Sequence, residues 1–202
     1  MDISKESIKI ALLGENFVRK TNLMNAFIGD NFKEDYESTS FPVWFEEKIK
    51  FRKNNFIYNI GYTIWDMPGF EEYRSINKMF IEGSKIILIV YSLDNKKSFD
   101  EVDFWIKFVK YNIENDKYII ALVANKSDLF LNQEVSDREG EEKAKYHGMD
   151  FLITSAKTNR KSIQEFVKKL IINYIAKYGF PSNDKESTLE LEFKELDKYI
   201  DF

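Results

Sequence analysis

The segment GENFVRKTN, residues 14–22, contains residue types that could bind the phosphates of a nucleotide. It follows the outline of a phosphate-binding loop, G-x-x-x-x-G-K-[ST], at Gly14, Lys20 and Thr21, but Arg19 stands where the pattern has its second glycine. The segment follows an apolar run and opens a predicted helix, an arrangement that points main-chain N–H groups and a helix dipole at an anion. The candidate phosphate ligands of this loop, called the phosphate loop below, are Gly14, Asn16, Phe17, Val18, Arg19, Lys20 and Thr21.

Three further segments place polar residues directly after apolar runs. WDMPG supplies Asp66, which can reach a phosphate-bound Mg²⁺, and Gly69, whose N–H can bond a terminal phosphate. NKSD occupies residues 125–128, and TSAK occupies residues 154–157. If the apolar runs are parallel strands, these loops converge on the edge where an open α/β sheet binds its ligands.

The apolar patterns predict an α/β fold with a mixed sheet. Short β-rich runs alternate with segments of helical period, which favours a parallel sheet covered by helices, and one hairpin alternates like an antiparallel edge. The predicted strands are 8–13, 43–51, 56–65, 86–91, 118–124 and 151–154, and the predicted helices are 20–28, 76–82, 99–112, 137–146 and 162–178. Ser98 and Ser136 are predicted N-caps, and Ser136 with Glu139 forms a capping box.

The chain length predicts one domain with a tail. We expect a domain over residues 1–178 and, over 179–202, a polar linker followed by an amphipathic helix. The helix is predicted because four apolar residues fall on one face, namely Leu189, Phe193, Leu196 and Ile200. This face either packs back on the domain or is presented to a partner or a second domain.

Composition excludes several classes of function. The 30 Lys and Arg against 34 Asp and Glu, a net charge of −4, give no electrostatic basis for binding nucleic acid. The absence of cysteine excludes disulfides, thiolate metal sites, a cysteine nucleophile and lipid attachment through cysteine. The N-terminus does not read as a secretion signal. We therefore expect a cytoplasmic protein without a direct lipid anchor in this chain, so that any membrane association comes through a partner or a missing segment.

Together these segments resemble the Ras superfamily of small GTPases, and within it the Rab branch. The resemblance covers about residues 8–178 and includes YSLDNKKSFDEVDFWI, ITSAKTNRKSIQEF and IWDMPGFEEYR. It implies a six-stranded, mostly parallel sheet with one antiparallel edge strand and five flanking helices. It also implies a molecular switch between GDP-bound and GTP-bound forms with Mg²⁺. Effector and exchange-factor proteins would bind residues 35–45, called switch I below, and residues 66–80, called switch II.

The family pattern assigns roles to individual residues. Asp128 can accept two hydrogen bonds from guanine, a donor pair that adenine lacks. By resemblance, Asn125 ties the base-binding loops together, Lys126 covers the base, and Ala156 donates to the guanine oxygen, with Ser155 and Lys157 beside it. Lys20 would bridge the β and γ phosphates. The implied metal ligands are Thr21, Thr39 and Asp66.

The chain departs from the pattern at three positions. Phe17 and Arg19 replace glycines, and if the backbone there has φ > 0, each costs on the order of 1–2 kcal/mol. Binding is then weaker, although the Arg19 guanidinium could reach a phosphate or a carboxylate and offset part of the loss. Phe70 replaces the glutamine that orients the attacking water, so we expect slow or absent hydrolysis. The rival interpretation is a pseudo-GTPase that keeps the fold without nucleotide-dependent switching.

Three aromatic residues match positions that meet partners in Rab relatives. In Rab relatives, aromatic residues on the strands between the switches and in switch II contact effectors. The matching residues here are Trp44, Trp65 and Tyr73, although core packing is an equally good interpretation of Trp65.

Overall fold

The computed structural model describes residues 7–34, 38–53 and 56–179. The predicted helix near the C-terminus lies outside these residues, as do residues 35–37 of switch I. None of the helices in the described ranges combines the length and the apolar character that crossing a membrane requires.

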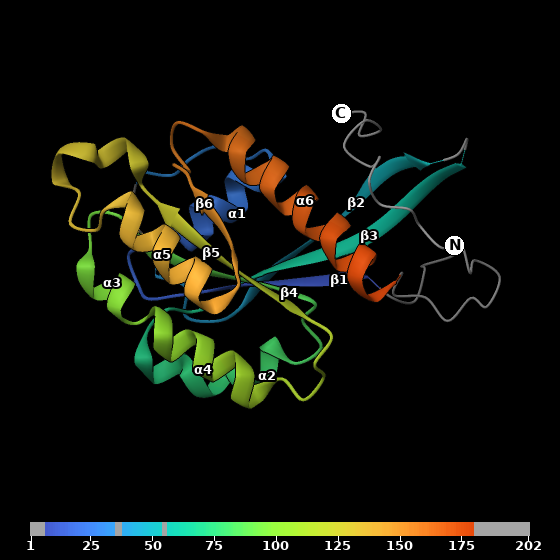
Figure 1. Ribbon diagram of the computed structural model, residues 1–202, viewed down its shortest axis with the longest axis horizontal. Helices are drawn as coiled ribbons and strands as arrows, with labels where there is room; N and C mark the ends of the chain where they lie inside the picture. Colours follow the sequence, from blue (N-terminus) through green and yellow to red (C-terminus); the bar gives the residue numbers. More distant parts are fainter. Residues whose placement is uncertain (1–6, 35–37, 54–55, 180–202) are drawn as a thin grey trace.

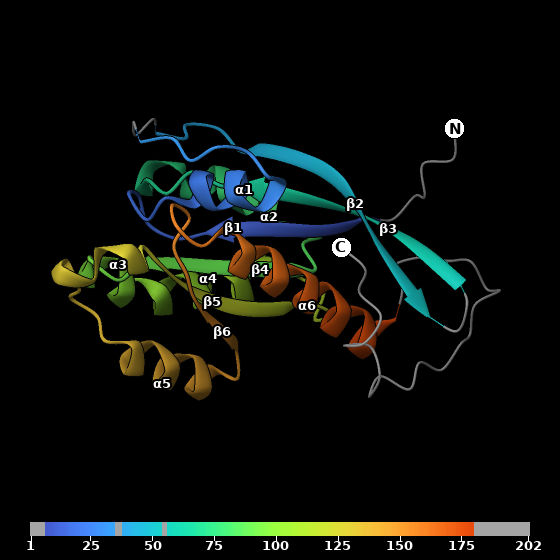
Figure 2. The same cartoon turned by 90° about the horizontal axis from the view of Figure 1, so that it is seen from above.

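Six strands form one sheet in the order β2-β3-β1-β4-β5-β6; they are labelled in Figure 1, and their order can be followed from top to bottom in Figure 2. The strands are β1 (Ile8–Leu13), β2 (Val43–Lys53), β3 (Phe56–Asp66), β4 (Ile86–Ser92), β5 (Ile119–Asn125) and β6 (Asp150–Ile153). Only β2 runs antiparallel, paired along its whole length with β3, while the neighbouring pairs β1–β3, β1–β4, β4–β5 and β5–β6 are parallel. The predicted mostly parallel sheet with one antiparallel edge is confirmed.

Helices cover both faces of this sheet (Figure 2). The α-helices of the described residues are α1 (Lys20–Ile28), α2 (Arg74–Ile81), α3 (Lys96–Asp100), α4 (Val102–Asn112), α5 (Asp137–His147) and α6 (Arg160–Tyr178), with 3₁₀ turns at Glu71–Tyr73 and Ser127–Asn132. Alternate residues of β1 point to opposite cores. Ile8 and Ile10 pack with α1 and α6, while Ala11 and Leu13 pack with α2, α4 and α5. The central strand β4 is buried at every residue and is apolar from Ile86 to Tyr91, because both of its faces are covered.

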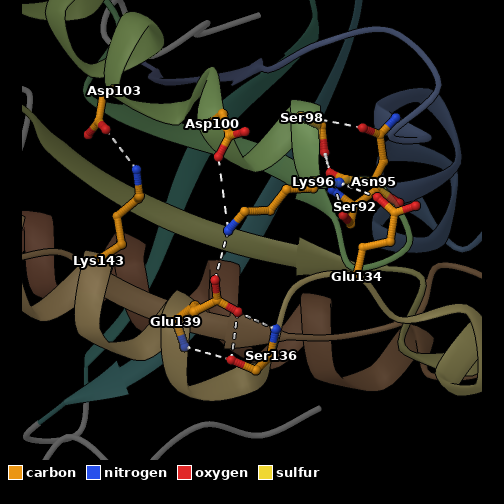
Figure 3. Close-up of polar contacts among 10 residues, drawn as sticks. All are labelled: Ser92, Asn95, Lys96, Ser98, Asp100, Asp103, Glu134, Ser136, Glu139 and Lys143. Atoms are coloured by element: carbon orange, nitrogen blue, oxygen red, sulfur yellow. Dashed lines mark hydrogen bonds and ion pairs between the residues drawn. The ribbon is translucent and has the colours of Figure 1, made fainter.

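The predicted helix 99–112 is instead two helices, and its predicted cap is wrong. Asn95 caps α3 by accepting the Ser98 N–H, and Ser98 itself lies buried inside the helix. The chain passes from α3 to α4 at Glu101. Asn95 takes the cap because it precedes the first helical turn, where its carboxamide reaches an unpaired N–H. Figure 3 shows this cap together with the Lys96–Glu139 ion pair that joins α3 to α5.

The predicted cap of α5 is confirmed. The Ser136 hydroxyl accepts the Glu139 N–H, and the Glu139 carboxylate accepts the Ser136 N–H, which completes a capping box. At the other end of α5, His147 contacts Asp103 of α4 at 3.0 Å. This contact joins the C-terminal end of α5 to α4.

Close packing between α5 and the sheet leads to a first prediction. A Cβ at Gly140 would lie 2.3 Å from the Tyr91 hydroxyl and 2.5 Å from the Phe151 ring. Overpacking of this kind typically costs about 1–3 kcal/mol, which offsets or exceeds the gain of about 1 kcal/mol from alanine's helix propensity. We expect Gly140→Ala to lower the free energy of unfolding in urea, whereas the adjacent exposed change Glu141→Ala leaves it nearly unchanged. Equal stabilities for the two variants would show that the packing tolerates the methyl group.

Candidate functional site

The loops that carry the predicted motifs meet at one edge of the sheet. The strands β3, β1, β4 and β5 are consecutive in the sheet, and their C-terminal ends lie along the same edge. Leu12 of β1 pairs with Asp66 of β3, and Ser92 of β4 pairs with Asn125 of β5. The phosphate loop therefore begins where β1 ends, next to the end of β3, and the NKSD segment follows β5. This is the edge at which parallel α/β sheets bind ligands.

The start of the phosphate loop requires glycine. Gly14 has φ of 140°, and a Cβ there would lie 2.1 Å from the Val90 carbonyl oxygen. No side chain fits so close to the backbone of β4. The start of the phosphate loop therefore packs directly against β4, and Lys20 follows at the start of α1.

The Lys20 ammonium lies inside the phosphate loop. Its Nζ donates to the carbonyl oxygens of Gly14 and Glu15, each at 2.9 Å. An ammonium has three N–H donors, so one more can reach an anion held by the loop. The bridging of β and γ phosphates by Lys20 stays a prediction.

Two residues of the loop adopt a conformation that suits glycine. Phe17 has φ of 63° and Arg19 has φ of 66°, both in the left-handed region. The positive φ that would strain a non-glycine residue is therefore present at both positions, and the strain costs about 1–2 kcal/mol at each. Outside this loop, Lys126 is the third residue of this kind among the described residues, with φ of 65°.

The Arg19 side chain bonds to main-chain carbonyls. Its Nη1 donates to the Lys33 carbonyl at 3.2 Å, and its Nη2 donates to the Glu34 carbonyl at 2.9 Å. These acceptors lie in the segment that follows α1. The guanidinium thus bonds two main-chain carbonyls, and its reach to a phosphate or a carboxylate stays a prediction.

The three predicted metal ligands converge on one point. The Thr21 hydroxyl donates to Asp66 Oδ2 at 2.6 Å, and the Thr39 hydroxyl lies 3.2 Å from both Thr21 Oγ1 and Asp66 Oδ2. The other oxygen, Asp66 Oδ1, is buried without a hydrogen-bond partner. Two hydroxyls and a carboxylate are the hard oxygen donors that Mg²⁺ prefers, so these residues fit the ion. Elsewhere in the described residues, no three His, Cys, Asp or Glu side chains gather as a metal site.

Burial perturbs the two charged groups of this site. It lowers the pKa of Lys20 to about 8, although Asp66 and Glu15 act in the opposite direction. Burial also raises the pKa of Asp66, against the influence of Lys20 and the two threonine hydroxyls. Both shifts mean that the charged forms lack solvation. A phosphate beside Lys20 and a cation beside Asp66 would each supply the missing interaction.

Switch II lies against the phosphate loop at Gly69. A Cβ at Gly69 would lie 2.7 Å from the Asn16 nitrogen and 2.7 Å from Lys20 Nζ. The next residue, Phe70, packs edge-to-face against Phe17 with ring centroids 6.4 Å apart. Two departures from the family pattern, at Phe17 and Phe70, are therefore in contact with each other.

A cavity of about 140 Å³ lies beside the phosphate loop. Its lining includes all of the predicted base-binding residues except Ser155, and it adds three that the sequence did not single out: Phe32, Glu34 and Leu129. The Phe32 ring provides a flat face against which a base can stack. Its position after α1 carried no sequence signal, because nothing in the local pattern distinguishes it from a packing residue.

Asn125 joins the loops around this cavity. Its side chain is fully buried, and its Nδ2 donates to the Val18 carbonyl at 2.8 Å. Its Oδ1 accepts the Ala156 N–H at 3.1 Å. This is the joining role that the resemblance implies for Asn125, although it also engages the N–H that was assigned to the guanine oxygen.

Ser155 orients the carboxylate of Asp128. The Ser155 hydroxyl donates to Asp128 Oδ1 and accepts the N–H groups of Lys157 and Thr158 at 3.1 Å. Asp128 therefore has one oxygen engaged by the protein while it lines the cavity. Lys126 also lines the cavity, and its Nζ lies 3.1 Å from both oxygens of Asp94, which fixes the lysine stem there.

A second set of residues that the sequence did not single out connects the phosphate loop to switch II. Arg74 Nη2 and Trp105 Nε1 both donate to Glu15 Oε1, at 3.3 Å and 3.1 Å. The Arg74 guanidinium also contacts Glu101 at 3.3 Å and lies 3.9 Å from the Phe104 ring centroid. These residues come from three separate elements, so no spacing in the sequence reveals their contact.

Comparison with known families agrees with this geometry. The family model described as "Ras family" matches residues 9–176. The matched region includes every residue predicted to bind phosphate, metal or base.

The pKa of Lys20 leads to a prediction about ligand binding. With a pKa of about 8, Lys20 is mostly protonated at pH 7 and mostly neutral at pH 8.5. Because only the ammonium form attracts a diphosphate, we expect the association constant for GDP to fall about fourfold over this interval. Titration calorimetry measures the change. Lys20→Met should bind more weakly and lose the pH dependence, and a wild-type constant that stays level up to pH 8.5 contradicts the assignment.

Proposed function

The chain belongs to the Ras family, and we propose that it is a Rab-like guanine-nucleotide-binding switch that takes up GDP and GTP with Mg²⁺. The observation that carries this proposal is the cavity beside the phosphate loop, with Asp128 in its wall. A nucleotide needs a slot for its base and a cradle for its phosphates at the right separation. The Asn125 hydrogen bond to Val18 joins the two directly.

Guanine selection follows from the chemistry of Asp128. A carboxylate is an acceptor, and guanine presents two adjacent donors on one edge, whereas adenine presents none in that arrangement. The Ser155 hydroxyl holds the carboxylate in place, so little rotamer freedom remains to be lost on binding. Phe32 and the stem of Lys126 would enclose the two faces of the base.

The phosphate end would combine Lys20 with a cation. Lys20 donates its remaining N–H to the phosphates, while Thr21, Thr39 and Asp66 would hold Mg²⁺. When bound, the cation neutralises part of the charge on the phosphates. Because Thr39 lies in switch I, its contact with Thr21 and Asp66 would link the position of that switch to the bound nucleotide.

A partner surface is supported by aromatic residues between the switches. Trp44 of β2 stacks on Trp65 of β3 with ring centroids 5.9 Å apart, and Trp65 contacts Phe80 of α2 at 5.7 Å. Phe41 contacts the same Phe80 ring at 5.4 Å. Trp44 and Phe41 are more than half exposed, and exposed aromatic clusters mark interaction sites. We propose that effector and exchange-factor proteins bind here and, in a traffic or signalling role, recruit the protein to membranes.

Hydrolysis by this site would be slow or absent. Phe70 offers no hydrogen bond to a water, and its ring packs on Phe17 beside the phosphate loop. The acidic neighbour Glu71 is bound to Arg74. The residue at the position that would orient a nucleophilic water therefore cannot hydrogen-bond to it.

One observation favours the rival function, a pseudo-GTPase interaction module. Arg74 holds switch II to Glu15 of the phosphate loop and to Glu101, and Asn77 donates to the Pro68 carbonyl at 2.9 Å. A switch held in this way could present one surface in every nucleotide state. Denaturing the purified protein and identifying released nucleotide by chromatography separates the two: released GDP or GTP supports the switch, and an empty, stable protein supports the module.

Base selectivity is tested at Asp128. Asp128→Asn replaces an acceptor with an amide donor that faces a guanine donor, so a charge-assisted hydrogen bond is lost and a mismatch is created. We expect GDP affinity to fall by about 100-fold, corresponding to roughly 2.7 kcal/mol. Titration calorimetry with GDP and ADP measures the change. If the variant binds GDP as tightly as the wild type, Asp128 does not contact the base.

Hydrolysis is tested at the two phenylalanines. Phe70→Gln alone should change the rate little, because Phe17 still occupies the adjacent space. The double change Phe17→Gly and Phe70→Gln relaxes the loop and allows glutamine to orient a water, so we expect single-turnover GTP hydrolysis to rise by about tenfold or more. A wild-type rate above that of the double variant argues against the assignment.

A further inference from the structure

Arg19 connects the phosphate loop to the segment that follows α1. Its guanidinium presents donors in a rigid fork, and two of them reach consecutive carbonyls, those of Lys33 and Glu34. The same guanidinium lies 5.7 Å from the ring centroid of Phe32. Residues 32–34 are called the cover segment below.

The cover segment is also held at two other points. Asn22 of α1 donates to the Lys33 carbonyl at 3.0 Å and accepts the Lys33 N–H at 2.9 Å. From the opposite side, Lys157 pairs with the Glu34 carboxylate at 2.8 Å, and its Nζ lies 5.8 Å from the Phe32 ring centroid. The Lys157 pair is largely exposed and contributes little. Arg19 and Asn22 therefore carry most of the attachment.

The attachment bears directly on the base cavity. Arg19, Phe32, Glu34 and Lys157 all line it, together with Asn125 and Asp128. A base held in this cavity would border the cover segment, so we expect its release to require movement of that segment. Contacts that hold the segment in place should therefore slow release.

We propose that Arg19 is a positioning residue that holds the cover segment over the guanine cavity and slows nucleotide release. This inference rests on the proposed function. Glycine at position 19 would relax the loop, but it could not reach the cover segment. Arg19, which stands at a glycine position of the phosphate-loop motif, thus strains the loop and at the same time holds the cover segment at the guanine cavity.

The deciding comparison is between the wild type and Arg19→Ala. Both carry a Cβ at a left-handed position, so backbone strain is the same to first order and only the guanidinium contacts differ. The full chain is loaded with a fluorescent GDP analogue and Mg²⁺, and release is followed after addition of excess GDP. We expect Arg19→Ala to release the analogue about tenfold faster, and Arg19→Lys, which keeps the charge without the fork, to lie between the two.

Arg138→Ala is the matched control. Arg138 is an exposed arginine on α5 that pairs with Glu142 and does not line the cavity. Its loss should leave release unchanged. Thermal unfolding followed by circular dichroism verifies that the variants fold. In Arg19→Ala, hydrogen exchange should increase at the amides of the cover segment. A general loss of stability would instead increase exchange throughout the protein.

The outcomes separate the inference from the proposed function. Wild-type protein that binds no GDP overturns both. Wild-type protein that binds GDP, with Arg19→Ala releasing it at the wild-type rate, overturns only the role of Arg19. Faster release without increased exchange in the cover segment also overturns it, because the effect would then not act through that segment.

Discussion

The site depends on one buried carboxamide. Asn125 is fully buried at the end of β5, where it donates to the phosphate loop at Val18 and accepts the N–H of Ala156. Each bond contributes about 0.5–1.5 kcal/mol, but leaving either partner unsatisfied would cost about 1–3 kcal/mol. A shift of any one loop therefore breaks the arrangement of all three. The distance between the base cavity and the phosphate cradle is set by this side chain and by the sheet register beneath it.

The phosphate loop combines backbone strain at two positions with side-chain contacts to neighbouring segments. Phe17 and Arg19 both hold left-handed backbone, which persists only when surrounding contacts over-determine it. Each has such contacts: Phe17 packs on Phe70 of switch II, and Arg19 bonds the segment after α1. The side chains that strain the loop thus attach it to two neighbouring segments. A loop with glycines at both positions would be relaxed but would lack these attachments.

Most of the fold and the motif residues could be predicted from sequence, because both are local signals. Apolar runs that are buried on both faces identified β1 and β4, and Ser136 with Glu139 identified the start of α5. The error at Ser98 arose from two polar residues competing for one cap, which only the backbone geometry of Asn95 decides. Phe32 and the contacts of Glu15 were missed for a different reason. They depend on which elements become neighbours in space, and no spacing along the chain encodes that.

The Glu15 contacts suggest how the phosphate loop and switch II communicate. The Glu15 carbonyl accepts a bond from Lys20, while its carboxylate accepts bonds from Arg74 and Trp105. One residue therefore contacts the phosphate-binding ammonium through its main chain and switch II through its side chain. If phosphates bind the loop as proposed, a movement of the loop would act on Arg74, which contacts Glu101 and Phe104 of the α4 region. Because Arg74 is mostly buried among these groups, switch II should move with the phosphate loop as a unit rather than independently of it.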